Sequence, residues 1–475
     1  MKFQGWGGDW RANVAIFGLS STGFSAADTL VELGATVRVF AKQADSELRD
    51  LLEVIGGELI ENDEDISALD EFKPELVITS PGFNPNHPLI KRANDLGVQV
   101  WTDIDLAWRL RDKQPNAKWI TITGTNGKTT TVEMVTHILN ESGRRAVACG
   151  NIGNPILNPL REPIDLDYFV VELSSFQLHY LSELSAFTSA FLNIADDHLD
   201  WHGDFDSYLE AKAKIYERTQ HAAVYNVEDS NTEKALENAD VIEGCRAIGF
   251  TLATPSVSMV GYVEDVLADR AFLDDRANNA LEISTHEQIS KIAPISVQLL
   301  QNVAAATAIT RSVGIEPSKI RDALITFSPA AHRNQFLGEI SGVRFINDSK
   351  ATNAHAAMAA LASLDDVVWI AGGDFKGVDP SELVAKVSGQ LKACVIIGKD
   401  QKTITNALNK HAPEVQVVQV EDSDSVMQRA VELAMKLASE GDTVLLSPAA
   451  ASFDQFDSYQ HRGEMFAQAV SSLEG

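Results

Sequence analysis

Short apolar runs alternate with amphipathic segments along the first hundred residues. Residues 23–33 have the spacing of an amphipathic helix that ends before Gly34. Other runs are short and rich in β-branched residues, which is typical of buried strands. They are Val14–Phe17, Thr36–Phe40 and Leu76–Thr79. Strands that alternate with helices predict a parallel sheet assembled from βαβ units.

The same alternation returns twice after a polar segment at residues 108–118, which we interpret as a linker between domains. In the middle of the chain, strands are expected to end at Thr123, Ala148, Val171 and Asn193. The last third holds four more short apolar runs, at residues 343–346, 367–370, 395–397 and 444–446. Residues 251–294 are the least patterned part and predict short strands and loops. The whole pattern predicts an α/β protein of three domains, with bounds 1–112, 113–328 and 329–475.

Composition narrows the class of protein. The 475 residues are 45% hydrophobic and 22% charged, which is ordinary for a soluble protein with sizeable cores. The formal charge of −28 disfavours nucleic acid and anionic lipid as partners. No stretch approaches eighteen apolar residues and the first residues do not form a signal peptide, so we expect a cytoplasmic protein. The cysteines have no metal-binding spacing and are interpreted as buried thiols: Cys149, Cys245 and Cys394.

The strongest chemical signal is the segment Gly124–Thr130, which has the sequence Gly-Thr-Asn-Gly-Lys-Thr-Thr between a predicted strand and a predicted helix. In such a turn, backbone N–H groups surround phosphate oxygens and the helix N-terminus adds partial positive charge. Lys128 can reach the outer phosphates, and the Thr129 hydroxyl can bind Mg²⁺. Ile122 replaces the glycine that the general pattern has five positions before Gly127. We predict a site for the phosphates of a nucleoside triphosphate here; a glycine turn that binds nothing is the alternative.

A second glycine turn, Gly18–Gly23, also follows a strand and opens a helix. The middle glycine of a dinucleotide fingerprint is Ser20, and Ala41 stands where an acidic residue would hold a ribose. These differences disfavour a redox cofactor. A uridine diphosphate group on this turn is the better prediction, and a tight turn without a ligand is the alternative.

Two polar clusters follow neighbouring strands of the predicted central sheet. They are Glu172–Gln177 and Asn193–Asp200. Carboxylate and imidazole groups beside a phosphate loop suit Mg²⁺, which prefers oxygen ligands and retains substrate phosphates. Taken alone, each cluster is better explained as a solvated turn or a helix cap. Together with Lys128, they predict a magnesium site.

An amphipathic helix is predicted over residues 206–216, with Tyr208, Ala211 and Ile215 on its buried face. Lys212 lies beside that face. A lysine in this position normally extends its amine to solvent, so periodicity alone predicts no role for it.

In the last third, polar residues follow three predicted strands. They lie in Asn347–Asn353, Gly372–Gly377 and Ser447–Phe456. The carboxyl ends of parallel strands share one edge of a sheet, so these segments predict a second site, for a small charged substrate.

In these motifs the chain resembles the Mur ligases, and most closely their D-glutamate-adding branch. The resemblance runs through nearly the whole chain. It rests on segments that occur in order: Ser80–Gly82, Gly124–Thr130, Gly150–Gly153, Glu172–Gln177, Asp197-His198, Tyr208–Tyr216, His332-Arg333, Asn347–Asn353, Gly372–Lys376 and Ser447–Phe456.

The resemblance implies a Rossmann-like N-terminal domain for a UDP-sugar, a central P-loop ATPase domain with a parallel sheet, and a Rossmann-like C-terminal domain that binds the amino acid and closes over the site. It implies a ligase that uses ATP and Mg²⁺ in peptidoglycan precursor synthesis. Such an enzyme activates the carboxylate of UDP-N-acetylmuramoyl-L-alanine as an acyl phosphate and joins it to D-glutamate. We expect a monomer without membrane insertion.

The resemblance also implies roles for individual residues. Contacts to ATP would come from Gly124, Thr125, Asn126, Gly127, Lys128, Thr129, Thr130, Asn302, Arg333 and Asp348. The catalytic residues would be Lys128, His198, Lys212 and Lys350, with Lys212 carbamoylated. The metal ligands would be Thr129, Glu172, His198 and carbamoylated Lys212. The UDP-sugar would contact Ser80, Gly82 and Asn151, and D-glutamate would contact Thr352, Lys376, Ser452 and Tyr459.

Three alternatives share part of this evidence. A sibling ligase for another amino acid would have the same phosphate loop, although the Asp-Asn-Pro-Arg motif of the diaminopimelate-adding enzyme is absent. Folylpolyglutamate synthase shares the ATPase core but not the Rossmann-like start with Ser80–Gly82. A non-catalytic nucleotide switch would need neither the carboxylate and histidine clusters nor Asp348–Lys350.

Overall fold

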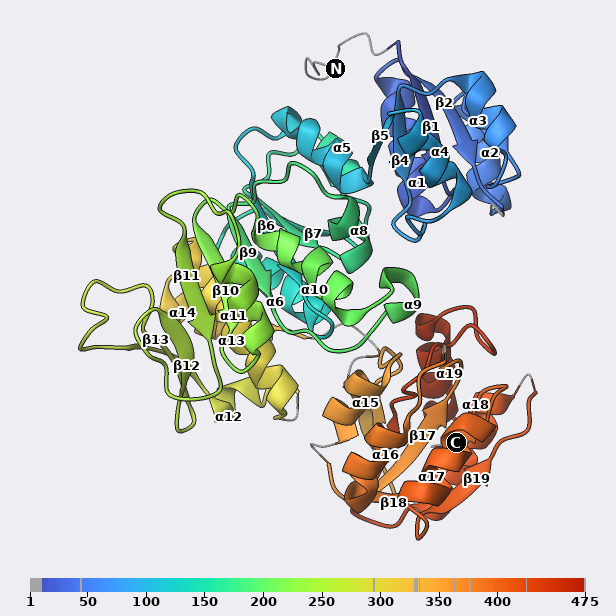
Figure 1. The fold of residues 1–475 in the computed structure, drawn as a ribbon. Helices are drawn as coiled ribbons and strands as arrows, with labels where there is room; N and C mark the ends of the chain where they lie inside the picture. The colour runs from blue at the N-terminus through green and yellow to red at the C-terminus, as the bar shows by residue number, and fades with distance from the viewer. Residues whose placement is uncertain are drawn as a thin grey trace. The chain divides into compact units, whose positions relative to one another are not determined.

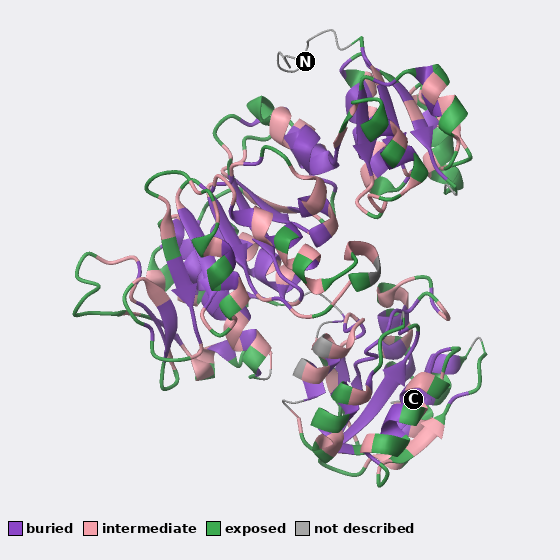
Figure 2. Cartoon of the chain, in the orientation of Figure 1, coloured by how far each residue is buried: buried purple, intermediate pink, exposed green. Residues whose placement is uncertain are grey.

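The computed structural model describes residues 11–42, 45–293, 295–328, 332, 334–361, 364–375, 377–423 and 425–473. Three sheets organise these residues, and helices pack on the sheets (Figure 1). Their contacts divide the chain into two compact units, one formed mainly by residues 1–264 and the other mainly by residues 324–475. In Figure 2 the strands are mostly buried and exposed residues lie mainly on helices and loops, as in α/β proteins.

The first sheet is parallel throughout and has the order β3-β2-β1-β4-β5. Its strands are β1 Asn13–Phe17, β2 Thr36–Phe40, β3 Glu58–Ile60, β4 Leu76–Thr79 and β5 Gln99–Trp101. Its helices are α1 Ser21–Glu32, α2 Ser46–Val54, α3 Ile66–Phe72, α4 Pro88–Asp95 and α5 Asp103–Arg109. Since the strand order reverses between β1 and β4, ligands are expected beyond the carboxyl ends of these two strands.

The central sheet has the order β14-β13-β12-β11-β10-β9-β6-β8-β7. Its strands are β6 Lys118–Thr123, β7 Ala146–Gly150, β8 Tyr168–Glu172, β9 Thr188–Phe191, β10 Ala222–Asn226, β11 Arg246–Phe250, β12 Met259–Val263, β13 Val266–Asp269 and β14 Leu281–Thr285. The helical segments are η1 Arg111–Lys113, α6 Lys128–Glu141, α7 Leu157–Arg161, α8 Ser175–Tyr180, α9 Leu199–His202, α10 Phe205–Ala213, η2 Lys214–Tyr216, α11 Ser230–Glu237, α12 His286–Ile289, α13 Val297–Ser312 and α14 Pro317–Thr326. Strand β6 lies between β8 and β9 and is parallel to both, which brings three strand ends to one edge.

The third sheet has the order β15-β16-β20-β17-β18-β19, in which only the β15–β16 pair is antiparallel among the described strands. Its strands are β15 Gln335–Ile340, β16 Val343–Asn347, β17 Val367–Gly372, β18 Leu391–Ile397, β19 Gln416–Gln419 and β20 Thr443–Leu446. Its helical segments are α15 Ala354–Leu361, α16 Ser381–Val387, η3 Ser388–Gln390, α17 Lys402–His411, α18 Val426–Leu437 and α19 Tyr459–Ser471. Strand β20 lies between β16 and β17, so the loops that follow these three strands are neighbours.

The predicted α/β class and its parallel sheets are confirmed. Strands β2 and β4 have the predicted bounds, and most others differ from the predicted runs by a few residues at one end. The polar segment interpreted as a linker contains the end of α5 and the turn η1, and Trp108 packs edge-on against Trp119 with ring centroids 5.2 Å apart. Among the described residues, no helix is both long and apolar enough to cross a membrane.

Candidate active site

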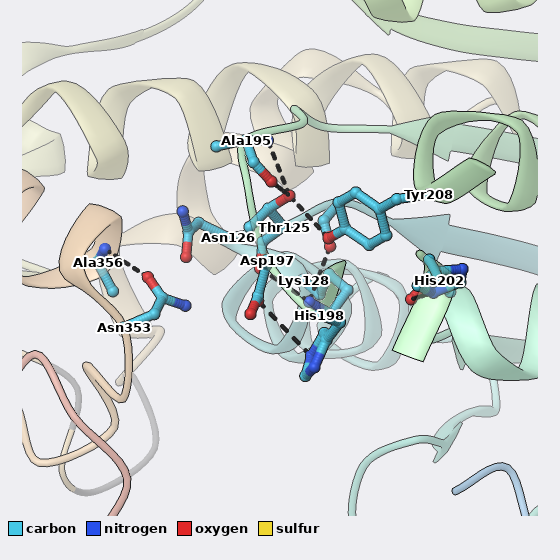
Figure 3. A network of polar contacts seen from close by, with 12 residues as sticks. Thr125, Asn126, Lys128, Ala195, Asp197, His198, His202, Tyr208, Asn353 and Ala356 are labelled. Atoms are coloured by element: carbon cyan, nitrogen blue, oxygen red, sulfur yellow. Dashed lines mark hydrogen bonds and ion pairs between the residues drawn. The ribbon is translucent and has the colours of Figure 1, made fainter. Parts of the chain in front are cut away.

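The turn between β6 and α6 is held in a fixed shape by the end of β9. The N–H of Thr125 donates to the Asn193 carbonyl at 2.9 Å, and the N–H of Asn126 donates to Asn193 Oδ1 at 2.9 Å. The Thr125 hydroxyl lies 3.0 Å from the Tyr208 hydroxyl, as Figure 3 shows. Gly127 has a φ of +78°, a left-handed conformation that glycine adopts without strain. These contacts and the left-handed glycine therefore fix the shape of the turn.

Helix α6 begins in a way that suits an anion. Its N-cap is Gly127, and no side chain caps the first turn. The amine of Lys128 folds back over the turn and donates to the carbonyl oxygens of Gly124 at 2.8 Å and Thr125 at 2.9 Å. Helix N–H groups without a side-chain cap, next to a lysine, bind phosphate groups well. The arrangement fits the triphosphate of a nucleotide.

Three predicted ligand-binding side chains meet at the ends of β7 and β8. Glu172 is only 2% exposed, and one carboxylate oxygen accepts a hydrogen bond from the Thr129 hydroxyl at 2.7 Å. Its other oxygen accepts from Asn151 Nδ2 at 2.9 Å. A hydroxyl and a carboxylate at hydrogen-bond distance, beside a phosphate turn, match the oxygen ligands that Mg²⁺ uses.

Lys212 does not extend to solvent. It lies on α10, is 2% exposed, and its amine donates to the Gly124 carbonyl at 2.9 Å and the Thr123 hydroxyl at 3.3 Å. Burial, and then the nearby charge of Lys128, lower the pKa of Lys212 well below its usual range. The expectation from periodicity is thus wrong for this lysine, because its amine lies against the strand end and the turn.

Asp197 and His198 lie in the segment before α9, with Asp197 Oδ2 3.6 Å from His198 Nε2 (Figure 3). The His198 side chain is 39% exposed, and its ring contacts Phe176 edge-on at 4.7 Å. Among the described residues, no group of three or more histidine, cysteine, aspartate or glutamate side chains could hold a metal ion. The predicted magnesium site would not form such a group, because only two of its four predicted ligands, Glu172 and His198, are residues of those types.

Two of the three predicted sugar contacts, Ser80 and Gly82, follow β4 of the first sheet, whereas Asn151 follows β7 of the central sheet. Ser80 follows β4, and its hydroxyl oxygen would be 2.6 Å from a Cβ built on Gly18, so it directly borders the Gly18–Gly23 turn. Within the described part of the chain, this buried hydroxyl has no hydrogen-bond partner. The Gly82 carbonyl accepts a hydrogen bond from Trp201 Nε1 at 3.3 Å. A buried hydroxyl at a strand end can bind a polar ligand group.

In the third sheet, the loops after β16 and β20 meet. Asp348 Oδ2 accepts a hydrogen bond from the Ser447 hydroxyl at 2.9 Å. The amine of Lys350 donates to the Tyr459 hydroxyl at 2.8 Å. We call residues 447–456 the β20 loop; Ser452 within it is 2% exposed. The structure thus brings together two of the three segments that were predicted for a second substrate, residues 347–353 and 447–456.

Of the remaining predicted residues, the structure describes two, Asn302 and Thr352, and does not describe the other two. Asn302 is buried on α13 with 6% of its surface exposed, and the N–H of Thr352 donates to the Lys350 carbonyl at 2.8 Å. Arg333 and Lys376 lie outside the described residues.

Arg462 is a structural residue that the sequence pattern did not reveal. It is fully buried on α19 and donates to the Ser349 carbonyl at 2.8 Å and hydroxyl at 3.0 Å, and to the Ala450 carbonyl at 3.1 Å. Burial lowers its pKa to about 9. Its guanidinium therefore links the segment after β16 to the β20 loop. A sequence signal existed, because Arg462 lies four residues before the buried Phe466 on the same helix face.

Comparison with known proteins identifies the family of this chain. The family described as Mur ligase middle domain matches residues 122–310, and Mur ligase, glutamate ligase domain, matches residues 332–450. Three α/β sheets in one chain, with the phosphate turn in the second of them, define the class: the chain belongs to the Mur ligase family.

Individual relatives narrow the class further. The chain is 47% identical to the UDP-N-acetylmuramoylalanine--D-glutamate ligase of Leifsonia xyli subsp. xyli, over 99% of this chain and 94% of that protein. It is 38% identical to the ligase of the same name from Mycolicibacterium smegmatis, over 98% and 97% of the two chains.

Solved structures show the same fold. UDP-N-acetylmuramate-alanine ligase MurC of Thermotoga maritima superposes with a TM-score of 0.59 at 17% identity, over 97% of this chain and 100% of that chain. MurF ligase of Thermotoga maritima, solved in complex with ADP, superposes with a TM-score of 0.58 at 16% identity, over 97% and 98% of the two chains.

Proposed function

We propose that this chain is an ATP-dependent ligase that joins UDP-N-acetylmuramoyl-L-alanine to D-glutamate, a step of peptidoglycan precursor synthesis. The observation that carries this proposal is the identity of 38–47% over at least 97% of the chain to ligases named for that reaction. Similarity of that extent favours the D-glutamate branch over a sibling ligase, folylpolyglutamate synthase or a nucleotide switch. We also propose the domain bounds 1–112, 113–328 and 329–475, a monomer, and a cytoplasmic location.

The phosphate turn would hold ATP through its backbone N–H groups and Lys128. The proposed nucleotide contacts are Gly124, Thr125, Asn126, Gly127, Lys128, Thr129, Thr130, Asn302, Arg333 and Asp348. Thr129, Glu172, His198 and Lys212 would hold Mg²⁺. When bound, Mg²⁺ would neutralise charge on the phosphate oxygens. The short distance between Thr129 and Glu172 supports this assignment.

Lys212 would act as a ligand of Mg²⁺ after carbamoylation. Its lowered pKa favours the neutral amine, whose nitrogen lone pair can form a bond to the carbon of CO₂ while one proton leaves to solvent. The product is an anionic carbamate with oxygen ligands. This change replaces a neutral buried amine near Lys128 by an anion, whose charge is opposite to that of Lys128.

The reaction would proceed through an acyl phosphate. A carboxylate oxygen of UDP-N-acetylmuramoyl-L-alanine attacks the γ-phosphorus, and ADP leaves. The amine of D-glutamate then attacks the acyl carbon, loses a proton, and phosphate departs with the carbon–oxygen electron pair. Ser80, Gly82 and Asn151 would position the sugar substrate, while Thr352, Lys376, Ser452 and Tyr459 would position D-glutamate. Lys350, 2.8 Å from the Tyr459 hydroxyl, would stabilise negative charge on the acyl phosphate.

A substrate-omission assay tests the function. Phosphate release by the full chain with ATP and Mg²⁺ is measured with both substrates, with each alone, and with L-glutamate, L-alanine or D-alanine in place of D-glutamate. We expect steady release only when UDP-N-acetylmuramoyl-L-alanine and D-glutamate are both present. Undiminished turnover without D-glutamate, or with L-alanine in its place, contradicts the proposal.

A further inference from the structure

Two side chains of the β20 loop fasten it to the loop that follows β18. Asp454 Oδ2 accepts a hydrogen bond from the N–H of Lys399 at 2.8 Å. Gln455 Oε1 accepts from the N–H of Gly398 at 2.7 Å, and its Nε2 donates to Asp422 Oδ1 at 2.7 Å. Three hydrogen bonds from consecutive side chains therefore fix the position of the loop against two neighbouring strand ends.

The backbones at this junction are in direct contact. Gly398 has a φ of +97°, and a Cβ built on it would be 2.5 Å from the Gly373 nitrogen and 3.2 Å from Asp454 Oδ2. A Cβ on Gly373 would be 2.2 Å from the Ala451 carbonyl oxygen. Any residue with a side chain would push these loops apart. The loops after β17, β18 and β20 thus form one close-packed surface.

Hydrogen bonds, more than apolar packing, position residues 453–455 of the β20 loop. Phe453 is 75% exposed and contributes little apolar burial, although Phe456 at the end of the loop is buried. Ser452 lies directly before Phe453, and its carbonyl accepts from the N–H of Phe456 at 2.9 Å. A shift of Asp454 would therefore move Ser452, which is two residues away in the same turn.

We infer that Asp454 and Gln455 are positioning residues that set the place of Ser452 and thereby the affinity for the amino-acid substrate. This inference rests on the proposed function, which assigns Ser452 to D-glutamate. The two residues act through the loop and do not touch substrate. Their effect is therefore specific to one of the three substrates.

Steady-state kinetics of the full chain test this role. We expect Asp454→Ala to raise KM for D-glutamate about tenfold, as loss of a hydrogen bond to a charged acceptor does, and Gln455→Leu to do the same. KM for ATP and for UDP-N-acetylmuramoyl-L-alanine should stay within about twofold of wild type. Asp454→Asn retains an oxygen acceptor for the N–H of Lys399 and should restore most of the affinity.

Asp400→Ala is the matched control. Asp400 follows Lys399 in the same loop, but within the described part of the chain its carboxylate accepts hydrogen bonds only at the start of α17, from the N–H of Lys402 at 3.1 Å and the Thr403 hydroxyl at 2.6 Å. The Asp400→Ala variant should leave all three KM values unchanged. Hydrogen exchange read by mass spectrometry gives a second readout: Asp454→Ala should speed exchange in peptides that contain Gly398 and Lys399, while Asp454→Asn should exchange there like wild type.

Two results would overturn the inference. One is Asp454→Ala and Gln455→Leu with wild-type KM for D-glutamate. The other is a rise of all three KM values together, which indicates general damage and not positioning. Failure of the proposed function is distinguishable, because wild-type enzyme would then turn over with a different amino acid, and the KM for that amino acid would show the Asp454 effect.

Discussion

Two glycine turns in this chain follow a strand and open a helix, yet only one of the two helices has a side-chain cap at its N-terminus. Both contain a left-handed glycine, Gly18 with φ +94° and Gly127 with φ +78°. In the first turn, Ser20 caps α1 by accepting from the N–H of Gly23 at 3.5 Å. In the second, α6 has no side-chain cap and Lys128 bends over the turn.

The difference separates two kinds of site that look alike in sequence. An uncapped helix end with a lysine is suited to the outer phosphates of a nucleotide. A turn that already caps its helix, with the Ser80 hydroxyl beside it, offers hydrogen bonds, and residues 18–23 include no lysine or arginine. The presence or absence of a side-chain cap at the helix N-terminus therefore indicates which turn binds the phosphates that react.

The largest effect is expected from Lys128→Ala. Removing the cation from the uncapped turn should lower kcat/KM by about a thousandfold, because its charge would act on phosphate oxygens in the transition state. Initial rates of phosphate release over a range of ATP concentrations measure this, with exposed Lys234→Ala as the control. Activity within tenfold of wild type would show that the uncapped helix end suffices without the lysine.

Lys212→Ala should come next, with turnover reduced about a hundredfold or more by loss of a metal ligand. The proposed carbamate predicts that added short carboxylates restore part of the activity of this variant but do not stimulate the wild type. Turnover equal to wild type would show that Lys212 is not a metal ligand.

Gly23→Ala tests the first turn through stability. A Cβ at this position would be 2.1 Å from the Gly18 carbonyl oxygen, so we expect a loss of about 2–3 kcal/mol in free energy of unfolding. Gly389→Ala is the control, since no atom lies within 4 Å of its added Cβ. Chemical denaturation followed by circular dichroism measures both. Equal stability of the two variants would mean that the turn relaxes without cost.

The smallest effect is expected from Ser20→Ala. Its cap hydrogen bond is long at 3.5 Å, so its loss should cost about 0.5 kcal/mol. KM for ATP should not change, because the nucleotide is proposed to bind the other turn, at the start of α6. A rise in KM for ATP comparable to the effect of Lys128→Ala would remove the contrast between the turns.

The parts that the sequence predicted well depend on local pattern. Strands such as Thr36–Phe40 are short runs rich in β-branched residues that are largely buried, so the pattern fixes their position. The phosphate turn could be predicted from the sequence equally well, because phosphate binding requires glycine, lysine and threonine at fixed spacing. Roles assigned through the family resemblance remain predictions for each residue.

The parts that were missed depend on tertiary contacts. Periodicity placed Lys212 at the edge of a helix face, and only the packing of α10 against the turn shows that its amine is buried. Arg462 and the hydrogen bonds of Asp454 join segments more than ten residues apart. No local pattern encodes which carbonyl or N–H a buried polar group will find.

The acyl-phosphate mechanism is tested by following oxygen from substrate to phosphate. UDP-N-acetylmuramoyl-L-alanine labelled with ¹⁸O in its carboxylate is incubated with the full chain, ATP, Mg²⁺ and D-glutamate, and the released phosphate is analysed by mass spectrometry. An acyl phosphate predicts that each phosphate carries one oxygen from the substrate carboxylate. Unlabelled phosphate formed together with the amide product would contradict the mechanism.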